Sequence, residues 1–175
     1  MTILSKPIAL VGPMGCGKST IGKMLSQELG IDFVDSDHSI MTKFGMNMSE
    51  IFDQFGEKFF RTEEENLITK LESERNIVLA TGGGAVTSLR VRDLLKSKFI
   101  SVFLNVDTET LWARICKNTQ IRPLINVPKG KKKMERLFKQ RLPYYYEADI
   151  IIESNMHDEK LDIVKAILKK LKICP

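Results

Sequence analysis

The sequence predicts an α/β domain in which a five-stranded parallel sheet lies between layers of helices, a three-layer arrangement. Strand-like and helix-like segments alternate along the chain, which is typical of parallel sheets with crossover helices. The strand-like segments also lack strict polar alternation, as expected of strands that helices cover on both faces. These segments are residues 8–11, 32–35, 77–80, 100–105 and 149–153.

The first predicted helix follows the first strand after a short glycine-rich loop. Residues 20–29 carry apolar side chains, among them Ile21 and Leu25, at helical spacing. Gly30 ends this pattern, as glycine commonly does at the end of a helix. We expect the helix to begin at Lys18.

Five further helices are expected between and after the later strands. They cover residues 58–75, 88–96, 108–116, 131–141 and 158–172. The fourth of these five is expected to stop near Pro143, because proline lacks the backbone donor that a helix interior needs. The last has acids at its start and lysines at its end, which complements the helix dipole. We expect it to pack on the sheet and not to lie on a membrane surface.

Length and composition fit a single globular domain over residues 1–175. The chain has 43% hydrophobic and 28% charged residues, as ordinary globular domains do. No apolar stretch approaches the roughly 20 residues of a membrane span, and the first residues lack the apolar region of a signal peptide. We therefore expect a cytoplasmic protein with no membrane role. No obvious exposed apolar stripe demands a partner chain, so a monomer is expected.

The cysteines indicate the redox compartment of the protein, and the net charge indicates the kind of ligand that suits it. Cys16, Cys116 and Cys174 are widely spaced, so we interpret them as free thiols of a reducing compartment. The net charge of +5 suits anionic ligands without identifying one. The densest basic segment, 129–133, has no interleaved aromatic residues, which indicates a solvated loop and helix start and not a nucleic-acid patch.

Residues 12–19 fit the nucleotide-binding pattern G-x-x-x-x-G-K-[S/T] between a strand and a helix. The glycines allow successive N–H groups to turn inward as an anion nest, and the helix adds its positive end. Lys18 is expected on the β/γ-phosphates, and the Ser19 hydroxyl on a Mg²⁺ ion. The sequence thus predicts the phosphate cradle of a P-loop NTPase-like fold. Its ATP-contacting residues are expected to be Gly12, Gly15, Cys16, Gly17, Lys18, Ser19 and Thr20.

Two carboxylates end the second strand, at Asp35 and Asp37. Residues two apart in an extended segment point the same way, so both would face one side of the ligand crevice. Phosphoryl transfer needs one such group near the Mg²⁺ shell and another to orient the attacking hydroxyl. No Asp ends the third strand, which leaves Asp35 for the indirect metal contact. The alternative is that Ser36 or Asp37 caps a helical segment over residues 38–44.

Arg61 and Glu64 lie three residues apart on a predicted helix, hence on one face. They could form a routine surface pair, or Arg61 could present its fork to a substrate carboxylate. Three glycines, Gly82, Gly83 and Gly84, directly follow the third strand. They indicate a close approach of backbone to ligand, with a ligand-free glycine turn as the alternative.

Residues 117–130 form a polar segment without sustained periodicity and are predicted to be a mobile lid. Arg122 in this segment could close over the γ-phosphate, stabilise the transferring group and exclude water. Arg141 could be a second clamp for a carboxylate. Each arginine taken alone could also be a surface charge.

Together these residues resemble the shikimate kinase family, in the family's order and over nearly the whole chain. The landmarks are the glycine loop at 12–20, Asp35 to Asp37, Phe60 to Glu64, Gly82 to Gly84, Arg122 to Leu124, and Arg141 with Tyr145. The resemblance implies transfer of the ATP γ-phosphate to the 3-hydroxyl of shikimate, with one Mg²⁺ ion, in the pathway to chorismate and the aromatic amino acids.

The resemblance also implies individual roles. Lys18 would hold the β/γ-phosphates and Asp37 would bind the attacking hydroxyl and accept its proton. Ser19 would contact the metal directly, and Asp35 would contact it through water. The substrate carboxylate would be bound by Arg61, Arg141 and the Gly83 backbone. Glu64 would support this pocket, and Gly82 and Gly84 would also contact the substrate. Arg122 would fold down with the lid onto ATP, and Arg114 would lie near the adenine, one place away from the usual spacing.

Two kinds of rival function remain open at this point. A gluconate or nucleoside monophosphate kinase would use the same cradle with another acceptor, and gluconate is also a carboxylated polyol. A nucleotide-dependent switch or binding module would keep the cradle without a working lid and acceptor pocket. The presence of Asp37, Arg61, Arg122 and Arg141 favours a kinase over a switch.

Overall fold

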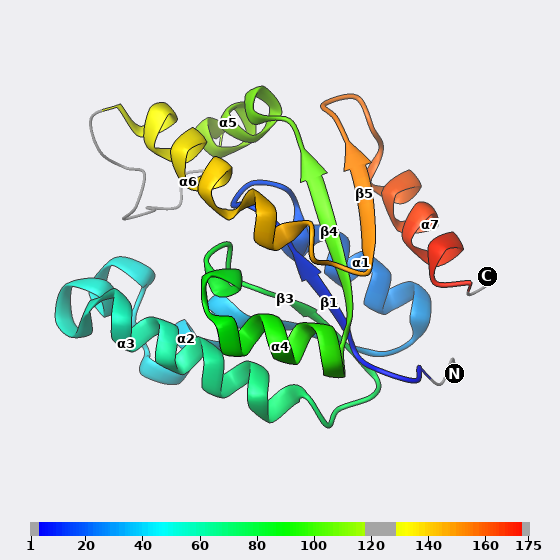
Figure 1. The fold of residues 1–175 in the computed structure, drawn as a ribbon, viewed down its shortest axis with the longest axis horizontal. Helices are drawn as coiled ribbons and strands as arrows, with labels where there is room; N and C mark the ends of the chain where they lie inside the picture. Colours follow the sequence, from blue (N-terminus) through cyan, green and yellow to red (C-terminus); the bar gives the residue numbers. More distant parts are fainter. Residues whose placement is uncertain (1–3, 118–128, 173–175) are drawn as a thin grey trace.

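The computed structural model describes residues 4–117 and 129–172, and these residues form one parallel sheet with helices on both faces (Figure 1). The five strands run in the order β2-β3-β1-β4-β5. Their bounds are Ile8–Val11 (β1), Asp32–Asp35 (β2), Ile77–Ala80 (β3), Ile100–Val106 (β4) and Ile150–Ser154 (β5). The predicted sheet is therefore confirmed, with strand ends displaced by at most one residue.

The helices alternate with the strands, as the pattern predicted. They are α1 (Lys18–Leu29), α2 (Ser36–Phe44), α3 (Met48–Leu71), α4 (Leu89–Lys98), α5 (Thr108–Lys117), α6 (Gly130–Tyr145) and α7 (Lys160–Lys170), with a short 3₁₀ helix η1 (Ala85–Thr87). No helix within the described ranges is both long and apolar enough to cross a bilayer.

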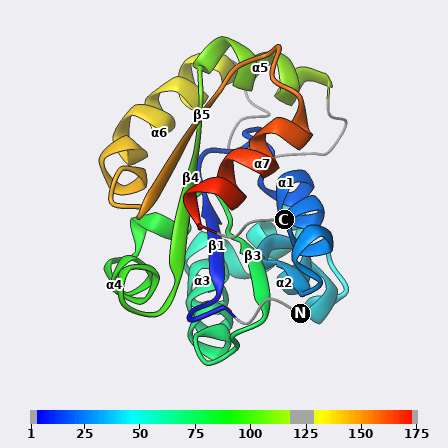
Figure 2. The ribbon, with the colours of Figure 1, turned by 90° about the vertical axis from the view of Figure 1, so that its right-hand side faces the viewer.

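Side chains of the central strand alternate between two cores. Ile8 and Leu10 pack into a cluster with residues of α1 and α7, whereas Ala9 and Val11 pack into a cluster with residues of α3, α4 and α6. Figure 2 shows α1 and α7 on one side of the sheet and α4 and α6 on the other. Because both faces are covered, every residue of β1 is buried and apolar.

Three neighbouring strands end at the same level of the sheet. In the register, Leu10 of β1 and Asp35 of β2 both pair with Ala80 of β3. The strands are parallel, so the loops that follow them leave the same edge. The fold thereby gathers the glycine loop after β1, the carboxylates after β2 and the glycines after β3.

Helix α3 differs from the prediction at its start and its end. It begins at Met48, behind a capping box between Asn47 and Glu50. Gly56, at φ 83° and ψ 162°, breaks it into two helical segments, and the second segment agrees with the predicted start at residue 58. The segment before Gly56 was not predicted. The helix ends at Leu71, so the predicted end at residue 75 was wrong.

Helix α6 continues through Pro143 to Tyr145, so the predicted stop was wrong. The proline stands in the last turn, where the missing donor costs a single helical hydrogen bond. The extra turn matters for the site, because it carries Tyr145 onto the same helix as Arg141. Ends of the other predicted helices agree with the structure within two residues.

Candidate active site

The glycine loop between β1 and α1 has the backbone geometry that the motif predicted. Gly12, Gly15 and Gly17 all have positive φ, at 144°, 83° and 101°. Side chains would also collide here, because a Cβ on Gly12 would lie 2.9 Å from Cys16 Sγ. Gly17 is the N-cap of α1 and has no side-chain oxygen to cover the helix N–H groups, which suits them to an anion.

The Lys18 ammonium group lies at the centre of this loop. Its Nζ donates to the carbonyl oxygens of Gly12 at 2.8 Å and Pro13 at 2.9 Å, and it lies 3.6 Å from Cys16 Sγ. The side chain is 9% exposed. A positive charge is thus fixed inside a ring of backbone groups, as a phosphate cradle requires.

The predicted metal contacts, Ser19 and Asp35, are brought together from two elements. Ser19 Oγ donates to Asp35 Oδ2 at 2.5 Å, while Asp35 Oδ1 caps α2 by accepting from the His38 N–H at 3.1 Å. Capping therefore falls to Asp35, and the suggestion that Ser36 or Asp37 caps this helix was wrong.

A hydroxyl and one carboxylate suit Mg²⁺, which usually binds one or two protein oxygens together with substrate phosphates and water. No cluster of three acidic, histidine or cysteine side chains that could hold a metal occurs within residues 4–117 and 129–172. The Ser19 hydroxyl and the Asp35 carboxylate therefore fit an ion that binds together with a nucleotide.

Three side chains that were predicted to bind the phosphate acceptor, those of Asp37, Arg61 and Glu64, meet at the loop Gly82 to Gly84. A Cβ on Gly82 would collide with the carboxylate oxygens Glu64 Oε1 and Asp37 Oδ1. A Cβ on Gly84 would collide with the Arg61 guanidinium. All three side chains thus pack directly on backbone that has no room for a side chain of its own.

Gly83 connects this loop to the phosphate cradle. A Cβ on Gly83 would lie 3.1 Å from the backbone nitrogen of Met14 in the glycine loop. The neighbouring Gly82 N–H donates to Ser36 Oγ at 2.8 Å, and Ser36 is fully buried. The predicted acceptor-binding residues and the glycine loop therefore lie next to each other.

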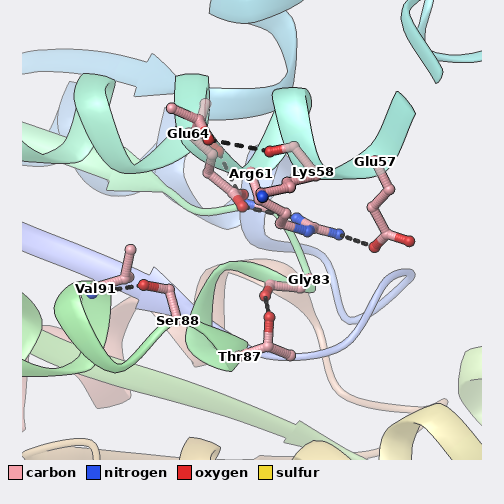
Figure 3. Close-up of polar contacts among 12 residues, drawn as sticks. Glu57, Lys58, Arg61, Glu64, Gly83, Thr87, Ser88 and Val91 are labelled. Carbon is pink, nitrogen blue, oxygen red and sulfur yellow. Dashed lines mark hydrogen bonds and ion pairs between the residues drawn. The ribbon is translucent and has the colours of Figure 1, made fainter. Parts of the chain in front are cut away.

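Arg61 lies between two carboxylates on α3 (Figure 3). Its Nη1 donates to Glu64 Oε2 at 2.7 Å, and its Nη2 donates to Glu57 Oε1 at 3.2 Å. Burial lowers the pKa of Arg61, but Glu64 and Glu57 outweigh burial and raise that pKa above its ordinary value. The guanidinium therefore remains a cation within reach of Gly84.

The Glu64 carboxyl group is 1% exposed. Burial raises its pKa from 4.5 to about 7, opposed by the charge of Arg61 and assisted by the charge of Asp37. No donor among the described residues reaches Glu64 Oε1. Glu64 and Arg61 therefore do not form the routine surface pair that the sequence left open as an alternative.

Helix α6 contributes Arg141 and Tyr145 from successive turns. Arg141 Nη1 donates to the Gly83 carbonyl at 3.3 Å, and the Tyr145 hydroxyl donates to the same oxygen at 2.5 Å. Both residues are buried. Burial raises the pKa of Tyr145 well above its ordinary value, so its hydroxyl remains a donor.

Arg114 of α5 contacts the glycine loop. Its Nη1 donates to the Cys16 carbonyl at 3.4 Å, and its Nη2 donates to the Asn155 carbonyl at 3.2 Å. It thereby joins the cradle to the turn after β5. Arg122 and residues 118–128 of the predicted lid lie outside the described residues, so their roles stay predictions.

Three polar residues of the site were not assigned roles in it from the sequence. In the sequence, Ser36 is only a possible helix cap and Glu57 belongs to no motif. Tyr145 is a landmark of the family resemblance and has no predicted function. Their signals are spatial, since each acts by touching a residue distant in sequence or on the next helical turn. Cys16 and Cys116 are free thiols, as predicted, whereas Cys174 lies outside the described residues.

Comparison with known proteins places the chain among kinases of one family. A family model described as shikimate kinase matches residues 14–172. Shikimate kinase of Francisella philomiragia is 43% identical over 155 residues, which cover 87% of this chain and 88% of that protein. An enzyme of the same name from Francisella tularensis subsp. holarctica gives the same identity and coverage.

Comparison with solved structures points to the same family. Shikimate kinase from Acinetobacter baumannii in complex with shikimate has a TM-score of 0.90 and 39% identity, covering 95% of this chain and 93% of that one. Shikimate kinase from Bacteroides thetaiotaomicron has a TM-score of 0.88 and 28% identity, covering 98% and 99%. A gluconokinase from Sinorhizobium meliloti, at a TM-score of 0.59 and 15% identity over 98% and 94%, shares the fold alone.

Proposed function

The chain belongs to the shikimate kinase family, and we propose which of its residues carry the phosphorylation of shikimate by ATP. That activity belongs to the biosynthesis of aromatic compounds, and the acceptor atom is the 3-hydroxyl of the substrate. The observation that carries the proposal is the packing of Asp37, Arg61 and Glu64 on the loop 82–84, beside the Met14 amide of the cradle.

The nucleotide end is held by the glycine loop. Backbone N–H groups at positive-φ glycines and at the start of α1 receive the phosphates, and Lys18 adds a buried positive charge. Ser19 would ligate one Mg²⁺ ion and Asp35 would contact it through water, and this ion would neutralise phosphate charge. Arg122 is proposed to reach the same phosphates from residues 118–128.

The acceptor end is held by charge. Arg61 and Arg141 would bind the substrate carboxylate, since two arginines converge on the loop 82–84 and Glu64 pins one of them. Asp37 would orient the attacking hydroxyl. The oxygen of the substrate hydroxyl would then form a bond to the γ-phosphorus as the bond between that phosphorus and ADP breaks. The hydroxyl proton would pass to Asp37.

An ADP-release assay tests the substrate and Asp37 together. We expect turnover with shikimate and none with gluconate or nucleoside monophosphates. In Asp37→Asn, kcat should fall by roughly 10²–10⁴-fold, because a positioned base contributes about that much, while ATP affinity is kept. Asp93→Asn, at an exposed position on α4, is the control and should retain wild-type turnover. Turnover on another acceptor alone, or an unimpaired Asp37→Asn, would reject the proposal.

We also propose a monomer that works in the cytoplasm. The free thiols Cys16 and Cys116 suit a reducing compartment. The large apolar side chains exposed in the described part of the chain come from several elements, including Phe55 of α3 and Leu89 of α4. A molar mass of 19.9 kDa by light scattering would match a monomer.

A further inference from the structure

The two carboxylates on Arg61 differ in how firmly they are held. Glu64 is 1% exposed and lies 2.7 Å from Nη1, whereas Glu57 is 46% exposed and lies 3.2 Å from Nη2 (Figure 3). Glu64 is enclosed by Arg61, Asp37 and the Gly82 backbone. Glu57 faces solvent, so it can leave Arg61 without any change in the core.

The position of Arg61 does not depend on Glu57. One face of the guanidinium packs against Gly84, which has no room for a Cβ. Its Nη1 is bonded to the buried Glu64. The Phe60 ring lies 5.4 Å from the guanidinium carbon. These contacts fix the orientation of the guanidinium. The effect that remains for Glu57 is to neutralise the positive charge of Arg61.

The backbone places Glu57 where it can bond Arg61 or turn away. It directly follows Gly56, whose positive φ breaks α3, and so it stands in the first turn of the second helical segment. A carboxylate is favoured there by the helix dipole whether or not it touches Arg61. Glu57 and Arg61 are four residues apart, so one turn of helix joins them.

We propose that Glu57 is a competing carboxylate, which holds the Nη2 side of Arg61 until the carboxylate of the substrate displaces it. The inference rests on the proposed role of Arg61 as a carboxylate clamp. Glu57 occupies the Nη2 side of the fork, and Glu64 occupies Nη1, so a substrate carboxylate that binds this guanidinium would compete with Glu57 for Nη2. Glu57 would then make the site selective for ligands whose acid group can displace it.

The test is the variant Glu57→Gln, which keeps the shape of the side chain and removes its charge. An exposed ion pair contributes about 0.2–1 kcal/mol, so the Kd for shikimate measured by calorimetry should fall by about 1.5- to 5-fold. KM should fall by the same factor, and kcat should change by less than that factor. A loss of stability alone would not lower Kd and KM together.

Glu63→Gln is the matched control. It removes the same charge from the same helix, but Glu63 pairs with Lys43 at 2.5 Å and not with Arg61. Its Kd for shikimate should equal that of the wild type. An equal fall in both variants would trace the effect to net charge and overturn the proposal.

A Kd for Glu57→Gln that is unchanged or raised would also overturn it, and a raised value would make Glu57 a positioning residue. Arg61→Gln separates this failure from failure of the proposed function. If Arg61→Gln leaves shikimate binding intact, the clamp itself is misassigned. If Arg61→Gln weakens binding while Glu57→Gln does not tighten it, only the competition is disproved.

Discussion

Glu64 shows how one buried residue can make the stability of the protein depend on pH. Its carboxyl group is buried between Arg61 and Asp37, and burial raises its pKa from 4.5 to about 7. An unfolded chain would have the ordinary value. Between these two values the folded protein holds more protons than the unfolded chain, so the free energy of unfolding decreases as pH rises across that window.

We predict that Glu64→Gln flattens this part of the stability profile. Urea unfolding between pH 4.5 and 7 should give a smaller decrease in the free energy of unfolding than the wild type shows. Glu28→Gln, at an exposed position on α1, should keep the wild-type slope. The same slope in Glu64→Gln and the wild type would remove Glu64 as its source.

Most residues that the structure brings together at the candidate site could be singled out from the sequence, because they belong to short motifs. Lys18 and Ser19 follow from the glycine loop, and Asp37 from its place after a strand. Roles that depend on tertiary contact could not be read in this way. Ser36 faces Gly82 across 46 positions of sequence, and only the folded sheet brings the two together.

At the scale of elements, the strands were easier to predict than the helix ends. β1 is a run of apolar residues because its alternate side chains pack into two different cores. Such an unbroken apolar run is a strong sequence signal for a buried strand. The extents of α3 and α6 were harder to predict because each helix contains a residue that usually ends a helical pattern, Gly56 in α3 and Pro143 in α6. In the structure Gly56 kinks a helix, and Pro143 stands where a helix tolerates it.

The additional turn of α6 yields a prediction for Tyr145. Its buried hydroxyl donates to the Gly83 carbonyl, so Tyr145→Phe leaves that carbonyl with the weaker Arg141 contact at 3.3 Å. We expect about 1–3 kcal/mol lower stability and a higher KM for shikimate, with KM for ATP nearly unchanged. Thermal unfolding and steady-state kinetics provide both values.

Tyr146→Phe is the neighbouring control. The Tyr146 hydroxyl accepts from Asn105 Nδ2 at 3.2 Å, and the residue is 47% exposed, so its loss should affect neither quantity appreciably. Equal effects in the two variants would show that the Gly83 contact has no special role in the acceptor pocket.

At the scale of the whole molecule, the order of the strands brings the residues of the candidate site together. Because β3 lies between β2 and β1, the loop 82–84 leaves the sheet between the carboxylates after β2 and the cradle after β1. Helix α3 then brings Arg61, and helix α6 brings Arg141, onto that loop. The sequence predicted the order of elements along the chain, whereas the order of strands across the sheet came only from the structure.

The most direct measurement is a crystal structure of the protein with shikimate and ADP-Mg²⁺. We predict shikimate on the loop 82–84, with its carboxylate on Arg61 and Arg141 and its 3-hydroxyl on Asp37, directed toward the phosphates held by Lys18. Glu57 should have left Arg61 in that complex. Shikimate bound away from this loop, or bound with its carboxylate toward Asp37, would contradict the account.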